Sequence, residues 1–129
     1  MLEFGELTER IIGAAIAVHR SLGPGFLESI YEASLALEFG EQGVTFERQV
    51  MVPVRYRGVA VGEHRLDLLV EKTIVVELKA VKQLEDVHFA VVRSYLHALS
   101  LQHGLLINFN AVTLQVKRVL ASAANRNDE

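Results

Sequence analysis

The 129-residue chain contains no cysteine, only two prolines and no long uninterrupted apolar run. Without cysteine it can form neither disulfides nor thiolate metal sites, which is compatible with a reducing compartment such as the cytoplasm. Its most apolar segment, residues 11–18, is too short to span a bilayer. The first ten residues lack the basic start and apolar stretch of a signal peptide. We therefore expect a cytoplasmic protein without a membrane partner.

A strong charge of one sign is also missing, because the formal net charge is −3. A nucleic-acid partner would need a local basic patch or a metal ion to offset the repulsion between phosphates and the acidic chain. The sequence has no HExxH zinc motif and no GxxxxGK phosphate-binding loop. No Ser-His-Asp arrangement can be inferred either. These signatures of catalysis and phosphate binding are therefore excluded.

What is present is a globular composition, since 50% of the residues are hydrophobic and 22% are charged. A chain of this length is sufficient for one domain with a core, but hardly for two. No internal repeat or linker interrupts it. We expect a single domain over residues 1–129, with a core from about 7 to 120 and a polar tail at 121–129.

Helical spacing marks three segments of the chain. Residues 6–22 carry a stripe at that spacing: Ile12, Ala15, Ile16, His19 and Leu22. The run SLGPG ends this helix, and a second is expected from about Leu27 to Gln42. A third is expected from 84 to about 102, with an inner side made of Leu84, Val87, His88, Val91, Tyr95 and Leu99.

Strand character appears between and after these helices. Residues 46–56 alternate, and Pro53 predicts an edge position or a bulge because proline cannot donate to a ladder. After a turn region from Gly58 to Gly62, residues 63–70 form a strand with Leu66, Leu68 and Val70 on one face. Residues 73–80, 105–109 and 114–120 are further strands. The order α-α-β-β-β-α-β-β predicts an α/β or α+β fold with a mixed central sheet flanked by helices.

Three charged residues interrupt the apolar strands at 63–70 and 73–80. Glu77 and Lys79 are two apart and point to the same face. If the intervening turn is centred on Lys72, Asp67 lies opposite Glu77, with Cβ atoms about 5 Å apart. Two facing carboxylates repel each other, and a hard divalent cation that takes oxygen ligands reverses that repulsion. The trio could then bind a metal ion, polarise a phosphate and orient water. A solvated face or a simple ion pair is the competing interpretation of Glu77 and Lys79.

The sequence resembles the bacterial GxxExxY family, assigned to the PD-(D/E)xK nuclease-like superfamily. The naming motif corresponds to Gly25-Phe26-Leu27-Glu28-Ser29-Ile30-Tyr31. The split superfamily motif is similar to Asp67 followed by Glu77-Leu78-Lys79. The stretches YLHAL and GLLINF also look like those of the family, so the resemblance covers about residues 7–120.

The resemblance implies a restriction-endonuclease-like core with Mg²⁺ or Mn²⁺ as cofactor and DNA or RNA as partner. Asp67 and Glu77 would be metal ligands, Lys79 the catalytic lysine and Glu28 an additional acidic residue that acts in catalysis and as a metal ligand. A carboxylate in the first turn of a helix is also favoured by the helix dipole, which is an equal explanation of Glu28.

One position departs from the family pattern. The family often has a glutamine four residues before the tyrosine of its YL pair, and here that position is Val91. A carboxamide could bridge water or phosphate, whereas valine neither donates nor accepts. This difference leaves two functional hypotheses, a metal-dependent nuclease and a catalytically silent nuclease-like domain that binds nucleic acid or protein. A third is an interaction module, such as a homo-oligomer that uses the apolar LLINF segment.

Several other side chains have a candidate role in the core or near the site. We expect His19 to be packed rather than to activate water, and Tyr31 to be a core aromatic whose hydroxyl pairs with a partner such as Glu28. For His88, the site, an interface and a core position are all open. Six basic residues would become phosphate contacts if they lie on the rim around Asp67, and are otherwise solvated: Arg48, Arg55, Arg57, Arg65, Lys117 and Arg118.

Overall fold

The computed structural model describes residues 4–121, which form three helices and a five-stranded mixed sheet. The elements are α1 Phe4–Leu22, α2 Glu28–Gln42, β1 Phe46–Tyr56, β2 Val59–Val70, β3 Ile74–Lys79, α3 Asp86–Leu99, β4 His103–Asn108 and β5 Gln115–Leu120. This is the predicted α-α-β-β-β-α-β-β order, and the α+β fold class is confirmed. Of the predicted polar tail, residues 122–129 lie outside the described part of the chain.

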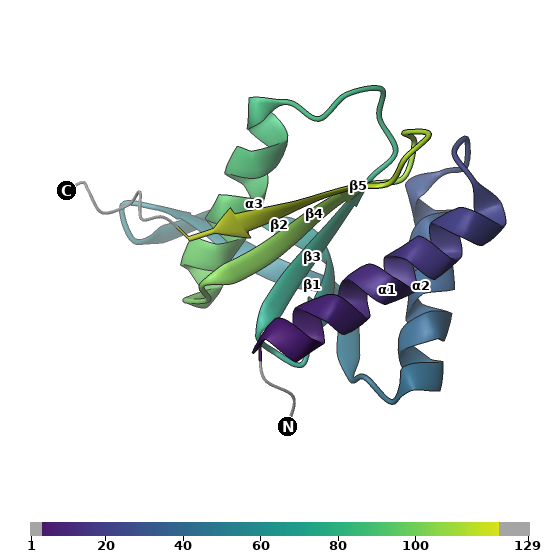
Figure 1. Ribbon diagram of the computed structural model, residues 1–129. Helices are drawn as coiled ribbons and strands as arrows, with labels where there is room; N and C mark the ends of the chain where they lie inside the picture. The colour runs from purple at the N-terminus through teal and green to yellow at the C-terminus, as the bar shows by residue number, and fades with distance from the viewer. Residues whose placement is uncertain (1–3, 122–129) are drawn as a thin grey trace.

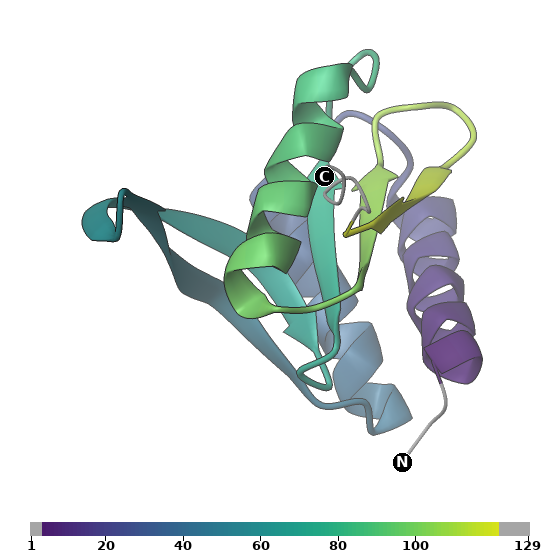
Figure 2. The same cartoon turned by 90° about the vertical axis from the view of Figure 1, so that its left-hand side faces the viewer.

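The strands lie side by side in sequence order, β1-β2-β3-β4-β5. All neighbours are antiparallel except β3 and β4, which are parallel and are connected through α3. Helices α1 and α2 cover one face of the sheet and α3 covers the other (Figures 1 and 2). Strand β1 is an edge strand, as Pro53 predicted.

Alternation along β3 divides the buried side chains between two cores, one on each face. Ile74, Val76 and Leu78 belong to the first core, which packs against α1 and α2. Val75 belongs to the second core, under α3. All five residues from Ile74 to Leu78 are buried, so β3 is the central strand that its apolar start predicted. Glu77 has the parity of Val75 and therefore emerges on the α3 face.

Two predicted boundaries are wrong. The turn expected over residues 58–62 is only Arg57-Gly58, and β2 begins at Val59. Both turn residues have positive φ, 54° and 80°, the geometry of a tight two-residue hairpin whose twist matches its strands. Val61 is an extra residue, because Val54 pairs with Gly62 while Arg55 pairs with Ala60. The hairpin is therefore several residues longer than the glycines suggested. Helix α3 is shorter than expected, since it begins at Asp86 and ends at Leu99.

The helix faces also differ from the predicted stripes. In α1 the buried side chains are Leu7, Thr8, Ile11, Ala14, Ala15 and Val18, whereas Ile16 is 38% exposed. The buried side of α1 is thus rotated about the helix axis from the predicted one. Alanines occur on both sides of this helix, so the spacing of apolar residues does not decide which side is buried. In α3, Val87 is 59% exposed and Val92 is buried instead.

Candidate active site

Asp67 and Glu77 lie together where β2 and β3 stop pairing. The last antiparallel pairs are Leu68–Val76, Leu69–Val75 and Val70–Ile74, around a turn that has Lys72 at its centre. Continuing this register places Asp67 opposite Glu77, as the sequence predicted. The Asp67 amide donates to Glu77 Oε1 at 3.4 Å, and Asp67 Oδ2 accepts from the Leu78 amide at 2.8 Å. The two carboxyl groups are thus held at one point on the sheet.

A break in strand geometry places Asp67 at this point. The β1–β2 pairing skips Gln49 and Asp67, and Gln49 has a φ of 52°, a left-handed conformation that side chains rarely adopt. Leu66 lies in the second core and Leu68 in the first, although both have the same strand parity. The prediction that Leu66 shares a face with Leu68 and Val70 is therefore wrong. Beyond Asp67 the hairpin twists away from β3, and we call its outer part, residues 50–66, the arm (Figure 2).

The environment of Glu77 opposes its ionisation. Its side chain is buried, with 6% of the residue exposed. The pKa of Glu77 is raised to about 8. Burial is the largest cause, the negative charge of Asp67 adds to it, and the positive charge of Lys79 partly offsets it. Burial also raises the pKa of Asp67, with contributions from the charges of Glu32 and Glu28. A cation placed beside these carboxylates would relieve both effects.

Glu28 approaches the same end of β3 from the opposite layer. Its Oε2 accepts a hydrogen bond from the Ala80 amide at 3.3 Å, directly after Lys79. Its negative charge raises the pKa of both Asp67 and Glu77. Glu28 therefore faces the sheet, and the carboxylates of this region come from three elements, α2, β2 and β3. Lys79 is half-buried, two residues from Glu77 on the same strand.

The chemistry of this donor set fits a hard divalent cation, which takes carboxylate oxygens. Within residues 4–121, however, no three histidine, cysteine, aspartate or glutamate side chains are already arranged to hold a metal ion. The oxygens of Asp67, Glu77 and Glu28 each accept a backbone amide hydrogen bond instead. Those contacts show that the carboxylates are oriented by the backbone around them. Binding of a cation would require the side chains to turn.

Sequence reasoning missed two neighbours of Asp67. Glu32 is 5% exposed and accepts from Arg48 at 2.9 Å and from Gln49 at 2.6 Å. Gln49 also donates to Asp67 Oδ1 at 3.4 Å, so it connects the two carboxylates. The position of Glu32 was a usable signal, because residues four apart share a helix side and Glu28 precedes it by four. The strained conformation of Gln49 has no signature in the sequence.

Tyr95 on α3 is a third missed neighbour. It is 3% exposed, and its hydroxyl donates to the Arg65 carbonyl at 3.2 Å. Burial raises the pKa of Tyr95, and the charges of Glu77 and Asp67 raise it as well. Tyr95 therefore joins α3 to β2 two residues before Asp67. Val91, one turn earlier, packs against the second core as a half-buried side chain.

The histidines and Tyr31 have structural contacts. His19 Nε2 lies 2.9 Å from the Ala111 carbonyl, which agrees with a packed residue. His88 Nδ1 accepts from the Glu85 amide at 2.8 Å in a capping box at the start of α3. Tyr31 is a fully buried core aromatic, but its hydroxyl does not pair with Glu28 as suggested. It donates to the Gly23 carbonyl at 2.6 Å and accepts from the Phe26 amide at 3.1 Å, which holds the loop before α2.

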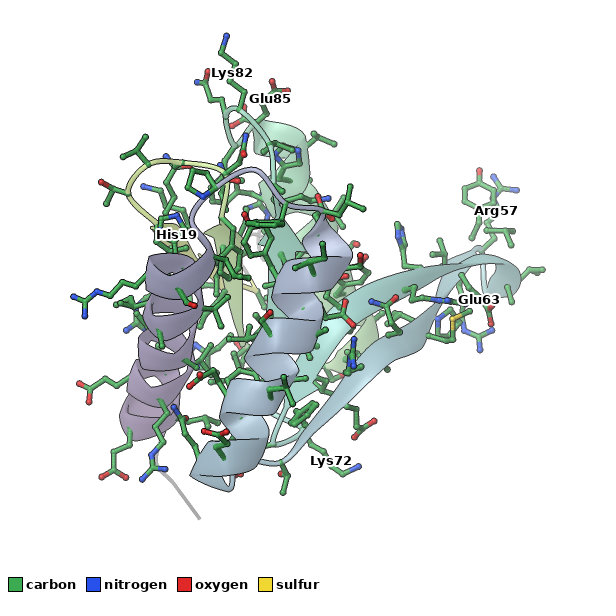
Figure 3. The ribbon with its side chains drawn as sticks, turned by 90° about the vertical axis from the view of Figure 1, so that its right-hand side faces the viewer. His19, Arg57, Glu63, Lys72, Lys82 and Glu85 are labelled. Atoms are coloured by element: carbon green, nitrogen blue, oxygen red, sulfur yellow. The ribbon has the colours of Figure 1, made fainter. Side chains whose placement is uncertain are left out.

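The predicted basic residues divide among three places. Arg48 forms the ion pair with Glu32, and Lys117 and Arg118 lie on β5. Arg55, Arg57 and Arg65 are exposed on the arm. Figure 3 shows Arg57 and Glu63 on the arm, which extends away from α1 and α2. The arm is thus a locally basic element of an acidic chain.

Comparisons with known proteins identify relatives of the whole fold. A family model described as the PD-(D/E)XK nuclease superfamily matches residues 5–119. No curated protein matches the chain. A solved structure, "Crystal structure of SSO0001", is similar with a TM-score of 0.57 and 20% sequence identity over 75% of this chain. The match covers 52% of that protein, so this chain spans about half of its length. The likeness shows a shared fold.

Proposed function

Because the chain belongs to the PD-(D/E)XK nuclease superfamily, we propose that it is a Mg²⁺- or Mn²⁺-dependent phosphodiesterase that acts on nucleic acid. One observation carries this proposal: half-buried Asp67 and buried Glu77 meet where β2 leaves β3, and the pKa of each is raised. Two adjacent carboxylates with that property favour a bound cation. The narrower GxxExxY assignment and a cytoplasmic location stay predictions. Across residues 4–121, no helix is long and apolar enough to cross a membrane.

Each residue of the site has a chemical role in this proposal. Asp67, Glu77 and Glu28 would hold the cation through carboxylate oxygens. When bound, the cation supplies Lewis-acid stabilisation of the phosphate charge. Lys79 supplies a mobile positive charge beside Glu77, where it would steady the attacking water or the charge that develops on the phosphate. Gln49 and Glu32 orient Asp67 through the contacts described above.

A catalytically silent nuclease-like domain is the second candidate. The observation that favours it is Val91, whose half-buried side chain packs in the second core and offers no hydrogen bond to water or phosphate. Such a domain would bind nucleic acid or protein without cleavage. The third hypothesis needs a correction, because Leu105, Leu106, Ile107 and Phe109 are at most 1% exposed. The LLINF segment is therefore not an oligomer surface, and any homo-oligomer would use another face.

Thermal melting with added Mn²⁺ and Mg²⁺ tests the metal site. We expect the melting temperature of the wild type to rise with cation concentration, because a ligand that binds the folded state stabilises it. Asp67→Asn should lose the rise, and Glu41→Gln, an exposed acidic change at the end of α2, should keep it. No rise in the wild type would contradict the proposal.

Cleavage assays with Mn²⁺ on single- and double-stranded DNA and RNA test the chemistry. We expect the wild type to cut at least one substrate and Lys79→Ala to be slower by 100-fold or more, about 3 kcal/mol of lost transition-state stabilisation. Salt-dependent binding without cleavage by the wild type would support the silent domain instead.

A further inference from the structure

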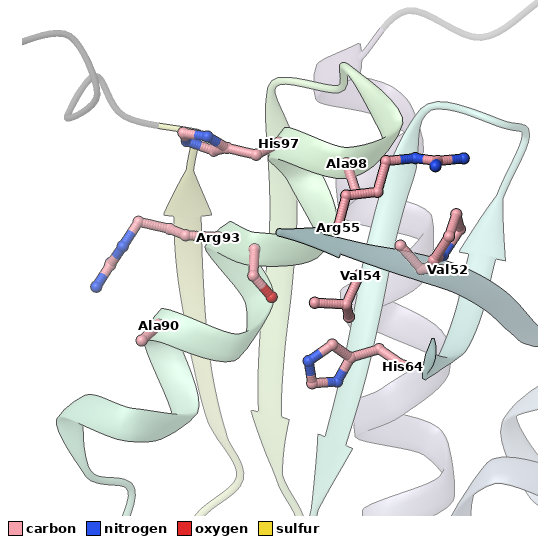
Figure 4. Close-up of a pocket in the computed structure, with 10 residues that line it drawn as sticks. Val52, Val54, Arg55, His64, Ala90, Arg93, His97 and Ala98 are labelled. Carbon is pink, nitrogen blue, oxygen red and sulfur yellow. The ribbon is translucent and has the colours of Figure 1, made fainter. Parts of the chain in front are cut away.

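A pocket of about 600 Å³ lies between the arm and α3 (Figure 4). Its arm side includes Val54, Arg55 and His64, and its helix side includes Ala90, Arg93 and Ala98. The volume is within the range of sites that hold small organic molecules. The pocket exists because the arm turns away from the sheet at Asp67, so that the strand pair and the helix diverge. We call it the arm pocket.

The lining of the arm pocket combines apolar surface with positive charge. Valine and alanine side chains supply apolar area, and the lining also contains two arginines and two histidines: Arg55, His64, Arg93 and His97. None of the residues that line it carries a carboxylate. In Figure 4, Arg55 on the arm and Arg93 on α3 extend in opposite directions, one from each wall. The pocket lining is therefore basic, although the whole chain has a net charge of −3. This composition suits an anion that also carries an apolar part.

The arm pocket is adjacent to the candidate active site. The ring of His64 lies 5.3 Å from the ring of Tyr95 in an edge-to-face contact. The Tyr95 hydroxyl donates a hydrogen bond to the Arg65 carbonyl. The charges of Glu77 and Asp67 also raise the pKa of Tyr95, so the ring lies near both carboxylates. One layer of side chains thus separates the pocket from the carboxylates. His64 of the pocket lining precedes Asp67 by three residues on β2, about 10 Å along a strand, and this is the span that a bound polymer would bridge.

We propose that the arm pocket binds one nucleotide of a single-stranded nucleic acid whose chain runs past the candidate site at Asp67 and Glu77. This inference rests on the proposed function and names its substrate class. An unstacked base would cover the apolar surface of Val54, Ala90 and Ala98, while Arg55 and Arg93 contact the flanking phosphates. A duplex keeps its bases paired and stacked, so it presents mainly phosphates to the protein surface and leaves that apolar surface uncovered.

The test measures binding of a fluorescent oligothymidylate to the full chain in buffer with EDTA, where cleavage is blocked. We expect the double variant Arg55→Ala/Arg93→Ala to bind about 10- to 100-fold more weakly than the wild type. The slope of log affinity against log salt should become shallower by about 1.4, because each phosphate contact on a single strand contributes about 0.7. The matched control is Arg20→Ala, an exposed arginine on α1, across the sheet, which should bind like the wild type.

A second variant tests the pocket without a change of charge. Ala98→Phe fills the arm pocket and should weaken oligothymidylate binding at least 5-fold, whereas Ala17→Phe on the exposed side of α1 should not. Equal binding by the double arginine variant, equal binding by Ala98→Phe, or tighter binding of a duplex of the same length would each overturn the inference. Binding that depends on Arg55 and Arg93 while Mn²⁺ supports no cleavage would retain the pocket and reject the phosphodiesterase.

Discussion

At the scale of single residues, the molecule concentrates unfavourable features around Asp67. Gln49 has a left-handed backbone conformation, Glu77 is buried beside another carboxylate, and Glu32 is buried with Arg48 and Gln49 as partners. Strained backbone and raised carboxyl pKa values both reduce the stability of the fold. They tend to occur at functional sites, because elsewhere selection for stability would eliminate them. Their coincidence here strengthens the case that this region has a chemical role.

The raised pKa of Glu77 predicts a pH dependence of stability in metal-free buffer. A carboxyl whose pKa is raised by folding binds its proton more tightly in the folded state. The contribution of Glu77 to the free energy of unfolding should therefore be greatest below pH 4.5, the ordinary value for glutamate, and should fall as the pH rises towards about 8. We expect a loss on the order of a few kcal/mol between pH 5 and pH 8, measured by urea unfolding.

Glu77→Gln provides the comparison for this pH series. The amide cannot ionise, so the variant should lose less stability than the wild type over the same interval. Some dependence should remain, because the pKa of Asp67 is raised as well. A wild-type free energy of unfolding that stays constant from pH 5 to pH 8 would show that Glu77 ionises without penalty.

At the scale of elements, the close approach of α3 to β4 depends on one glycine. A Cβ atom at Gly104 would lie 2.8 Å from Val92 Cγ1 and 3.4 Å from the Val75 carbonyl oxygen. Val92 is fully buried in the second core, so its side chain has little room to move. Gly104 therefore sets the distance between the sheet and the helix that carries Tyr95 and Arg93.

Gly104→Ala should destabilise the fold by about 1–3 kcal/mol, the usual penalty for overpacking a core. Gly13→Ala is the matched control, because Gly13 lies within α1 with nothing within 4 Å of an added Cβ. That control should gain roughly 0.5–1 kcal/mol from helix propensity. Urea unfolding measures both. Equal stability of Gly104→Ala and the wild type would show that α3 can shift away from β4.

The sequence predicted the helices and strands more accurately than it predicted the contacts between them. The order of helices and strands and the position opposite Glu77 follow from local signals, namely strand alternation and the turn at Lys72. The different faces of Leu66 and Leu68 were not predictable, because they depend on the twist of β1 against β2 at Gln49. The contact of Tyr95 with the site region depends on how α3 packs on the sheet, which a single sequence does not specify, whereas Glu32 could have been found from its spacing to Glu28.

At the scale of the whole molecule, two cores share one thin sheet. Leu69 and Leu68 are adjacent in β2 and belong to different cores, so neither core can open without exposing the backbone of the other. The structure therefore predicts that the described residues, 4–121, unfold as one cooperative unit.

The three tyrosines provide a test, since Tyr31 lies in the first core, Tyr95 in the second and Tyr56 on the arm. With 3-fluorotyrosine incorporated, the fluorine signals of Tyr31 and Tyr95 should disappear at the same urea concentration. The 65% exposed Tyr56 reports on the hairpin separately. Distinct midpoints for Tyr31 and Tyr95 would mean that the two layers unfold independently.

The break at Asp67 has a consequence for how such a protein can change over generations. From Pro53 to Glu63 every side chain except Val54 is exposed, so most substitutions there disturb neither core. The carboxylates, in contrast, lie where the two layers meet and are tied to the backbone of both strands. Substitutions can therefore accumulate along the arm while the candidate site and the fold stay unchanged.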